Sequence, residues 1–407
     1  ADLVRTSERG HGSAGSYDQR PLVRGGGAAH RRDMARYVFS SHDGFGVGHV
    51  RRNVLIARAV LERDPGADIV IVTGLTVRPS WLGDDRLRVE RIPGLVKDAD
   101  GAYRSQAGSF TEAVERRAAR FHEIVTAHVP DVVVVDRHPY GIGGELRPGL
   151  DLAADRGAAT VLGLRDILDE ASVVAAELAG DGWAGVADRY DGVVVYGDRV
   201  LCDHETEYGL PVTPRYCGWV VEPRTVDQRQ QGLLVVTAGG SGDGEAVFEL
   251  GMDVCASMPE IRAVLVAGPY ATSSLVGDDL TARGLADRVH LVRDTPGCGP
   301  LFARADRVVQ MAGYNSTFEC LAAGLRPVLV PRRTPRREQA IRATRLAALG
   351  LADVVDEPAS ATDVAWLLRR PRSLAPGQLE AAGIRLDGAA RTARYLTALA
   401  GRRTVAA

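Results

Sequence analysis

Residues 232–244 read GLLVVTAGGSGDG, and residues 36–48 read RYVFSSHDGFGVG. Each stretch is a short apolar run that leads into clustered glycines, and a helical pattern follows both. After the earlier stretch, one apolar stripe with helical spacing is formed by Val50, Val54, Ala57 and Leu61. A strand, glycine loop and helix therefore open the chain's two halves in the same way, which predicts two Rossmann-like units.

Further strands are predicted where short apolar runs alternate with helical segments. They are Asp68–Thr73, Asp131–Val135, Thr160–Leu164 and Gly192–Tyr196 in the first half, and Arg262–Ala267, Arg288–Val292, Asp306–Gln310 and Pro327–Val330 in the second. Continuous Val and Ile runs are typical of strands covered by helices on both faces, as in parallel sheets. The alternation predicts an α/β protein.

The domain boundaries follow from changes in composition. We expect a disordered leader over residues 1–33, a first Rossmann-like domain over 34–217, a polar linker over 218–231, a second Rossmann-like domain over 232–375 and a helical segment over 376–407. The leader lacks the apolar core of a secretory signal.

Composition excludes several classes of protein. The 407 residues carry a net charge of −2, so nothing indicates bulk attraction to nucleic acid. No run approaches the roughly 20 apolar residues of a membrane span. Five cysteines without a CxxC pair indicate neither a disulfide framework nor a zinc site and fit the reducing cytoplasm. Lys97, the only lysine, lies outside any P-loop sequence.

In the first half, polar residues follow predicted strands or the first glycine loop. His49 comes directly after Gly46 and Gly48, and Asp136 ends a Val-rich strand. Another pair, Arg165 and Asp166, ends the next strand. Ligands of open α/β sheets bind at the carboxyl ends of strands, so these residues predict an acceptor-facing surface. A structural role for each side chain is the alternative.

In the second half, candidate donor-binding residues lie at three strand-to-helix turns. They are Gly239, Gly240 and Ser241 in the first turn, Gly313, Asn315, Ser316 and Glu319 in the second, and Glu338 and Gln339 in the third. Free N–H groups at a helix start suit a diphosphate. The spacing of Ser316 and Glu319 is also that of a capping box, which needs no ligand, and spacing alone favours it.

Metal binding is not expected. Asp98-Ala99-Asp100 has the spacing of a metal-binding DxD sequence, but it lies in a charged loop and predicts a turn.

The second half resembles the family-28 (MurG-like) glycosyltransferases. The matching residues are the Gly239-Gly240-Ser241 loop, Ala312-Gly313, Glu319, Ala322-Ala323-Gly324, residues 327–331 and Glu338-Gln339. Residues 41–49, 134–136, 163–166 and 335–339 are similar to a bacterial group known as predicted glycosyltransferases. The sequence departs from family 28 in two places. Val50 to Asn53 stand where family 28 has a proline-containing sequence, and Glu338 stands where it has glutamine.

The resemblance implies a GT-B fold, with two Rossmann-like domains facing across a cleft and the donor in the second. It implies a UDP-sugar donor and inversion at the anomeric carbon. We expect a nucleotide-sugar cosubstrate, with a UDP-sugar favoured over other nucleotide sugars, and no metal or other cofactor. Glu319 would bind ribose, Asn315 and Ser316 would lie near the diphosphate, and Glu338 with Gln339 would contact the donor sugar.

His49 is the first candidate for the general base, with Asp136 and Asp43 in reserve. A nucleotide-sugar epimerase and a non-catalytic sugar-binding protein are alternatives. A dinucleotide-dependent oxidoreductase is disfavoured because Val72-Thr73-Gly74 lacks the acid that holds a ribose. The sequence leaves the acceptor open among a lipid-linked sugar, a polymer and a secondary metabolite, and it leaves peripheral membrane contact open.

Overall fold

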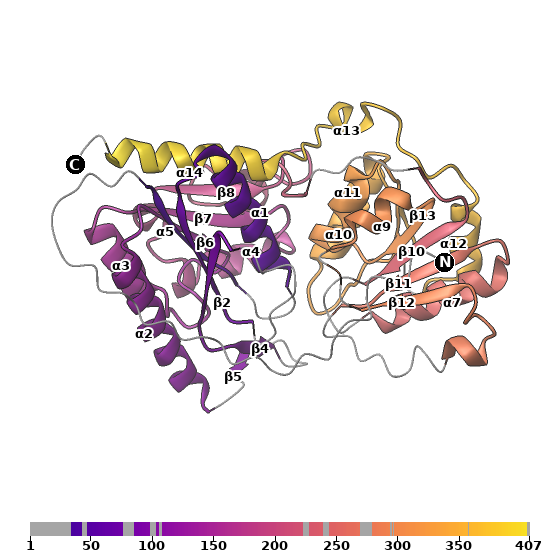
Figure 1. Ribbon diagram of the computed structural model, residues 1–407, viewed down its shortest axis with the longest axis horizontal. Helices are drawn as coiled ribbons and strands as arrows, with labels where there is room; N and C mark the ends of the chain where they lie inside the picture. The colour runs from indigo at the N-terminus through magenta and orange to yellow at the C-terminus, as the bar shows by residue number, and fades with distance from the viewer. Residues whose placement is uncertain are drawn as a thin grey trace. The chain divides into compact units, whose positions relative to one another are not determined.

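The computed structural model describes residues 34–42, 47–75, 85–97, 103–105, 108–222, 228–238, 244–268, 279–293, 295, 297–356 and 358–404 (Figure 1). Several predicted features lie outside these ranges: the leader, Asp43, Gly46, the Asp98–Asp100 turn, and the Gly239-Gly240-Ser241 loop. The described residues belong to one compact unit, which contains both sheets.

The first sheet contains seven parallel strands. In spatial order they are β3 (Leu87–Arg91), β2 (Asp68–Thr73), β1 (Arg36–Ser40), β6 (Val132–Asp136), β7 (Ala159–Arg165), β8 (Gly192–Tyr196) and β9 (Arg215–Tyr216). The order reverses direction between β1 and β6, where Ser40 lies opposite Val135. This reversal is the topological switch point at which α/β sheets bind ligands.

The second sheet repeats this arrangement with six parallel strands. They are β12 (Val289–Val292), β11 (Arg262–Val266), β10 (Leu233–Thr237), β13 (Arg307–Gln310), β14 (Val328–Leu329) and β15 (Asp353–Val354). Its switch point lies between β10 and β13. The prediction of two parallel sheets is confirmed, because every strand predicted from an apolar run is present.

Helices connect the strands in both halves. The first half contains α1 (Gly48–Arg63), α2 (Phe110–His128), α3 (Arg147–Asp155), α4 (Ala171–Leu178), the 3₁₀ turn η2 (Asp181–Trp183), α5 (Val186–Arg189) and α6 (His204–Tyr208). The second contains α7 (Glu245–Ser257), α9 (Gly299–Arg304), α10 (Tyr314–Ala322), α11 (Glu338–Ala348), α12 (Ala361–Leu368) and α13 (Gln378–Ala381). The last helix is α14 (Gly388–Thr404), and β4 (Leu95–Lys97) pairs antiparallel with β5 (Tyr103–Ser105).

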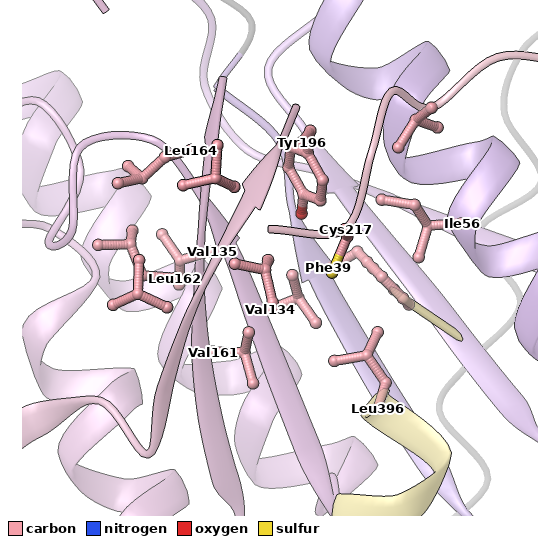
Figure 2. Close-up of a cluster of buried hydrophobic side chains, with 14 of the residues drawn as sticks. Phe39, Ile56, Val134, Val135, Val161, Leu162, Leu164, Tyr196, Cys217 and Leu396 are labelled. Carbon is pink, nitrogen blue, oxygen red and sulfur yellow. The ribbon is translucent and has the colours of Figure 1, made fainter. Parts of the chain in front are cut away.

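The core of the first sheet includes side chains from α1 and α14. The predicted apolar stripe of α1 is buried along its length. Figure 2 shows Phe39 of β1 and Val134 of β6 in a cluster with Ile56 of α1 and Leu396 of α14. Burying each such side chain contributes about 1.5–3 kcal/mol. The carboxy-terminal helix therefore packs on α1 and stabilises the first half, although the strands next to it in sequence belong to the second (Figure 1).

The residues after β9 differ from the predicted polar linker. Trp219 is fully buried, stacks on Phe318 of α10 with ring centroids 4.4 Å apart, and donates from Nε1 to Asp166 Oδ2 at 3.2 Å. Val220 and Val221 are also buried. The linker therefore begins as packed structure, because the Trp219 ring fills the space between Asp166 and α10. The domain boundaries themselves stay a prediction.

Candidate functional site

The switch point of the first sheet brings His49 and Asp136 together. Asp136 is the last residue of β6, and His49 is the second residue of α1. His49 Nδ1 lies 3.1 Å from Asp136 Oδ2. The Asp136 side chain is fully buried, whereas the His49 side chain is 17% exposed, so one edge of the imidazole can meet a substrate.

Arg52, one turn after His49 on α1, completes this group. Its Nη2 donates to Asp136 Oδ1 at 2.7 Å and to Oδ2 at 2.5 Å. The same nitrogen lies 3.1 Å from His49 Nδ1, but the shorter carboxylate contacts indicate that its hydrogens point to Asp136. His49 Nδ1–H then donates to Asp136, which leaves Nε2 as the nitrogen that can accept a proton.

The electrostatics of the three residues favour a neutral His49. Burial lowers the pKa of His49 to about 4, although the Asp136 carboxylate opposes this shift. Burial raises the pKa of Asp136, but Arg52 and His49 outweigh that effect and hold the pKa at about 2. At neutral pH, Asp136 is therefore ionised and His49 is an unprotonated base.

Two further histidines lie beside His49, and neither was among the predicted site residues. The ring of His42, after β1, meets the rings of His49 and His138 edge-on, with centroids 5.4 and 4.5 Å apart. His42 Nε2 also lies 2.8 Å from the hydroxyl of Tyr103. Burial lowers the pKa of His42 well below its ordinary value, and the neighbouring histidines add to this. The sequence could have indicated both residues, because His42 lies beside the first glycine loop and His138 follows the Val-rich strand that ends at Asp136.

The start of α10 lies against the start of α1. Asn315, the second residue of α10, donates from Nδ2 to the carbonyl of Gly48, the first residue of α1, at 3.3 Å. A Cβ on Gly48 would lie 3.1 Å from the same nitrogen, so the approach is close. The positive ends of two helix dipoles therefore meet at one place.

The predicted capping box is wrong. The N-cap of α10 is Gly313, and Ser316 and Glu319 lie inside the helix. Helix α10 begins earlier because Tyr314 is held on both sides. Its hydroxyl donates to the Tyr196 carbonyl at 2.9 Å and accepts from Val220 N at 3.1 Å.

Glu319 is buried, and both of its carboxylate oxygens have partners. Its Oε2 accepts from the backbone N–H groups of Cys298 at 2.8 Å and Gly299 at 3.1 Å, while Oε1 pairs with Arg51 of α1. Burial raises the pKa of Glu319, whereas Arg51 and the two N–H donors lower it. The carboxylate predicted to bind ribose thus contacts the first half.

Glu338 and Gln339 are buried at the start of α11. Arg332 donates from its backbone N to Gln339 Oε1 at 3.2 Å and from Nη2 to Glu338 Oε1 at 3.3 Å. Glu338 Oε2 is buried and accepts no hydrogen bond from the described residues. Burial raises the pKa of Glu338, but Arg165, Arg332 and Arg342 together lower it.

Arg165 and Asp166, adjacent at the end of β7, have different surroundings. Burial lowers the pKa of Arg165 to about 10, so it remains charged at neutral pH, and its Nε has no hydrogen-bond partner among the described residues. Asp166 accepts from Arg342 Nη2 at 2.7 Å and Nε at 2.8 Å. Because Asp166 is paired with Arg342 of α11, a structural role is favoured for Asp166. Arg165 differs, since its Nε–H group can still donate a hydrogen bond to a ligand.

The described residues offer neither an arranged metal site nor a membrane-spanning helix. Among them, no group of three or more His, Cys, Asp or Glu side chains is arranged to hold a metal ion. No helix in the described part of the chain is both long and apolar enough to span a membrane.

Comparison with known proteins identifies the fold. No protein-family profile matches the chain. A curated relative is the UDP-N-acetylglucosamine–N-acetylmuramyl-(pentapeptide) pyrophosphoryl-undecaprenol N-acetylglucosamine transferase of Paenarthrobacter aurescens (strain TC1). It is 28% identical over 327 residues, which cover 76% of this chain and 80% of the relative.

Two solved structures are similar over nearly the whole chain. The glycosyltransferase SnogD from Streptomyces nogalater is 20% identical, with a TM-score of 0.58, and the match covers 90% of this chain and 100% of SnogD. MurG from Acinetobacter baumannii is 14% identical, with a TM-score of 0.54, and the match covers 91% and 99%. The fold is therefore the GT-B fold, and the resemblance to MurG-like glycosyltransferases is confirmed.

Proposed function

We propose, from the premise that this chain is a MurG-like glycosyltransferase with the GT-B fold, that it moves a sugar from a UDP-sugar to an acceptor hydroxyl with inversion. The observation that carries this proposal is the meeting of two helix starts, α1 and α10, next to the His49–Asp136 pair. The start of a single helix binds anions moderately well, and two helix starts that lie next to each other favour a ligand with two phosphate groups.

The proposed reaction is a single displacement. The acceptor oxygen forms a bond to the anomeric carbon as its proton passes to His49 Nε2, and the bond from that carbon to the diphosphate oxygen breaks. The electron pair leaves with UDP, whose added charge is stabilised by the two helix starts. Asp136 holds the imidazole in the required tautomer and stabilises the imidazolium that forms, as a buried carboxylate does in other enzymes with a histidine base.

Donor binding is assigned to α10 and α11. Asn315 and Ser316 at the start of α10 lie nearest the proposed diphosphate, and Glu319 is the proposed ribose ligand. The proposed contacts to the sugar are Glu338, through its unpartnered Oε2, and Gln339. Arg165 can add positive charge near the leaving group. We propose no metal or other cofactor, so chelation with EDTA should leave the rate unchanged.

The other functions considered from the sequence receive no support from the comparisons. The relative and the solved structures named above are transferases, so an epimerase or an oxidoreductase has no positive observation in its favour. The acceptor stays unassigned. We propose a cytoplasmic enzyme, which fits five free cysteines, with peripheral membrane contact only if the acceptor is lipid-linked.

The first test is nucleotide binding. We expect UDP to raise the unfolding temperature of the purified protein by a few degrees, because a ligand at about 100 times its Kd adds roughly 2.7 kcal/mol to the stability of the folded state. ADP, GDP and TDP at equal concentration serve as matched controls for the base. A panel of UDP-sugars then identifies the donor, and mass spectrometry of products from a cell extract identifies the acceptor. Absence of any nucleotide effect would contradict the proposal.

A second test concerns pH. Because His49 must be unprotonated to accept a proton and its pKa is about 4, kcat/KM should stay nearly flat between pH 8 and pH 6 and fall only as the pH approaches 4. At pH 5 roughly nine tenths of the activity should remain, whereas an ordinary histidine would leave only a few per cent. If the residual activity of a His49→Ala variant shows the same acid limb, the titrating group is not His49.

A further inference from the structure

Arg51 has no role in the function proposed above, yet it is paired across the two sheets. Its guanidinium forms an ion pair with Glu319 Oε1, and the two side chains are 13% and 5% exposed. Arg51 comes from α1 of the first half, and Glu319 from α10 of the second. The pair is therefore a largely buried link between the two halves.

The loop before α9 packs closely against this guanidinium. Gly297 has a φ of +150°, which disfavours other residues, and a Cβ at this position would overlap Arg51. The next two residues, Cys298 and Gly299, supply the N–H groups that hold Glu319 Oε2. One short segment thus accommodates the arginine and fixes the carboxylate.

The ion pair between Arg51 and Glu319 competes with the proposed binding of ribose by Glu319. Oε2 of Glu319 already accepts two hydrogen bonds, and Oε1 is paired with Arg51 in a side chain that is only 5% exposed. We therefore expect ribose hydroxyls to compete with Arg51 for Oε1. The proposed diphosphate site is close: Arg51 lies three residues after Gly48, or roughly 4.5 Å along the helix axis. Gly48 is the residue whose carbonyl contacts the start of α10.

We propose that Arg51 exchanges partners when the nucleotide binds, moving from Glu319 to the diphosphate and thereby freeing Glu319 for the ribose. This inference rests on the function proposed above. A guanidinium pairs well with phosphate oxygens, and a diphosphate carries more charge than one carboxylate, so the exchange is favourable. A nucleoside without phosphates must displace Arg51 and offers it nothing in return. The exchange therefore makes binding selective for the diphosphate.

The test compares UDP with uridine by isothermal titration calorimetry in the wild type and in Arg51→Ala. The variant should bind UDP severalfold more weakly, because it loses the contact with the diphosphate and regains only part of that loss from a Glu319 that no longer has to release Arg51. It should bind uridine severalfold more tightly, because Glu319 is already free. Arg63→Ala is the matched control: it removes the same charge from an exposed position on α1, roughly 18 Å along the axis from Arg51, and should change neither affinity.

The two expected changes in affinity, weaker for UDP and tighter for uridine, distinguish this proposal from a merely structural role of Arg51. If Arg51→Ala weakens both ligands alike, or leaves both unchanged, the exchange does not occur. If wild-type protein binds no UDP, the proposed function itself fails. Arg51→Lys keeps the charge and should retain most of the affinity for UDP. Circular dichroism spectra of each variant verify folding, and Arg51→Gln replaces the alanine variant if that one does not fold.

Discussion

Replacing His49 with alanine is expected to lower kcat by roughly two to four orders of magnitude, which is the usual contribution of a positioned general base. The affinity for UDP should be unchanged within about twofold, because the proposed donor contacts come from α10, from α11 and from the backbone at the start of α1, and none of them uses the His49 side chain. The measurement is the initial rate with a saturating UDP-sugar and its acceptor, together with calorimetric titration of UDP on the same preparation. A large loss of kcat with intact donor binding places His49 at the chemical step.

The control is His122→Ala, which removes an exposed histidine from α2 and should leave the rate unchanged. The Asp136→Asn variant tests the supporting contact. It keeps the shape of the side chain but removes the charge that faces His49 and Arg52. We therefore expect kcat to fall although His49 Nε2, the proposed proton acceptor, is still present. Normal turnover by His49→Ala would exclude it as the base, and equal loss of UDP binding would indicate a structural role.

The elements that the sequence predicts are those set by local pattern. The Val-rich strand before Asp136 and the apolar stripe of α1 each carry their own periodicity, and both are present. The strands that were missed are β3, β4, β5, β9 and β15. Strands β9 and β15 lie at sheet edges. These two edge strands have only two residues each, Arg215–Tyr216 and Asp353–Val354, and are defined by pairing with a neighbour rather than by their own composition.

The site was predictable in its location but not in its pairings. Carboxyl ends of parallel strands share one edge, so His49 and Asp136 were expected near each other. Which arginine pairs with which acid depends on helix register. Arg51 and Arg52 are adjacent in sequence but point about 100° apart on α1, so one reaches Glu319 and the other Asp136.

The capping-box error has a similar cause. The sequence near Ser316 permits a helix start there, but the hydroxyl of Tyr314 is fixed by Tyr196 and Val220, which lie far away in the chain. Contacts of this kind leave no trace in local spacing. They matter for function because they set where the free N–H groups of α10 lie.

Replacing Arg342 with methionine is expected to lower the free energy of unfolding by about 3–5 kcal/mol, which is the usual cost of breaking a buried ion pair. The side chains of Arg342 and Asp166 are 1% and 0% exposed, and two hydrogen bonds of 2.7 and 2.8 Å join them. The variant would leave the Asp166 carboxylate buried with only Trp219 and the backbone of Ile167 as donors. Equilibrium urea denaturation of the purified protein measures the loss.

Helix α11 supplies its own matched control in Arg345, three residues after Arg342. Arg345 also pairs with an acid of the first half, Glu207, but both side chains are about a third exposed, so Arg345→Ala should cost only about 0.2–1 kcal/mol. Arg342 also donates from Nη1 to the Ala312 carbonyl at 2.7 Å, just before α10. The methionine variant should therefore weaken UDP binding as well as stability, whereas the Arg345 variant should affect neither strongly. Equal destabilisation by the two variants would mean that burial of the Arg342 pair has no special weight, and that the helix start at the proposed diphosphate site is held by other contacts.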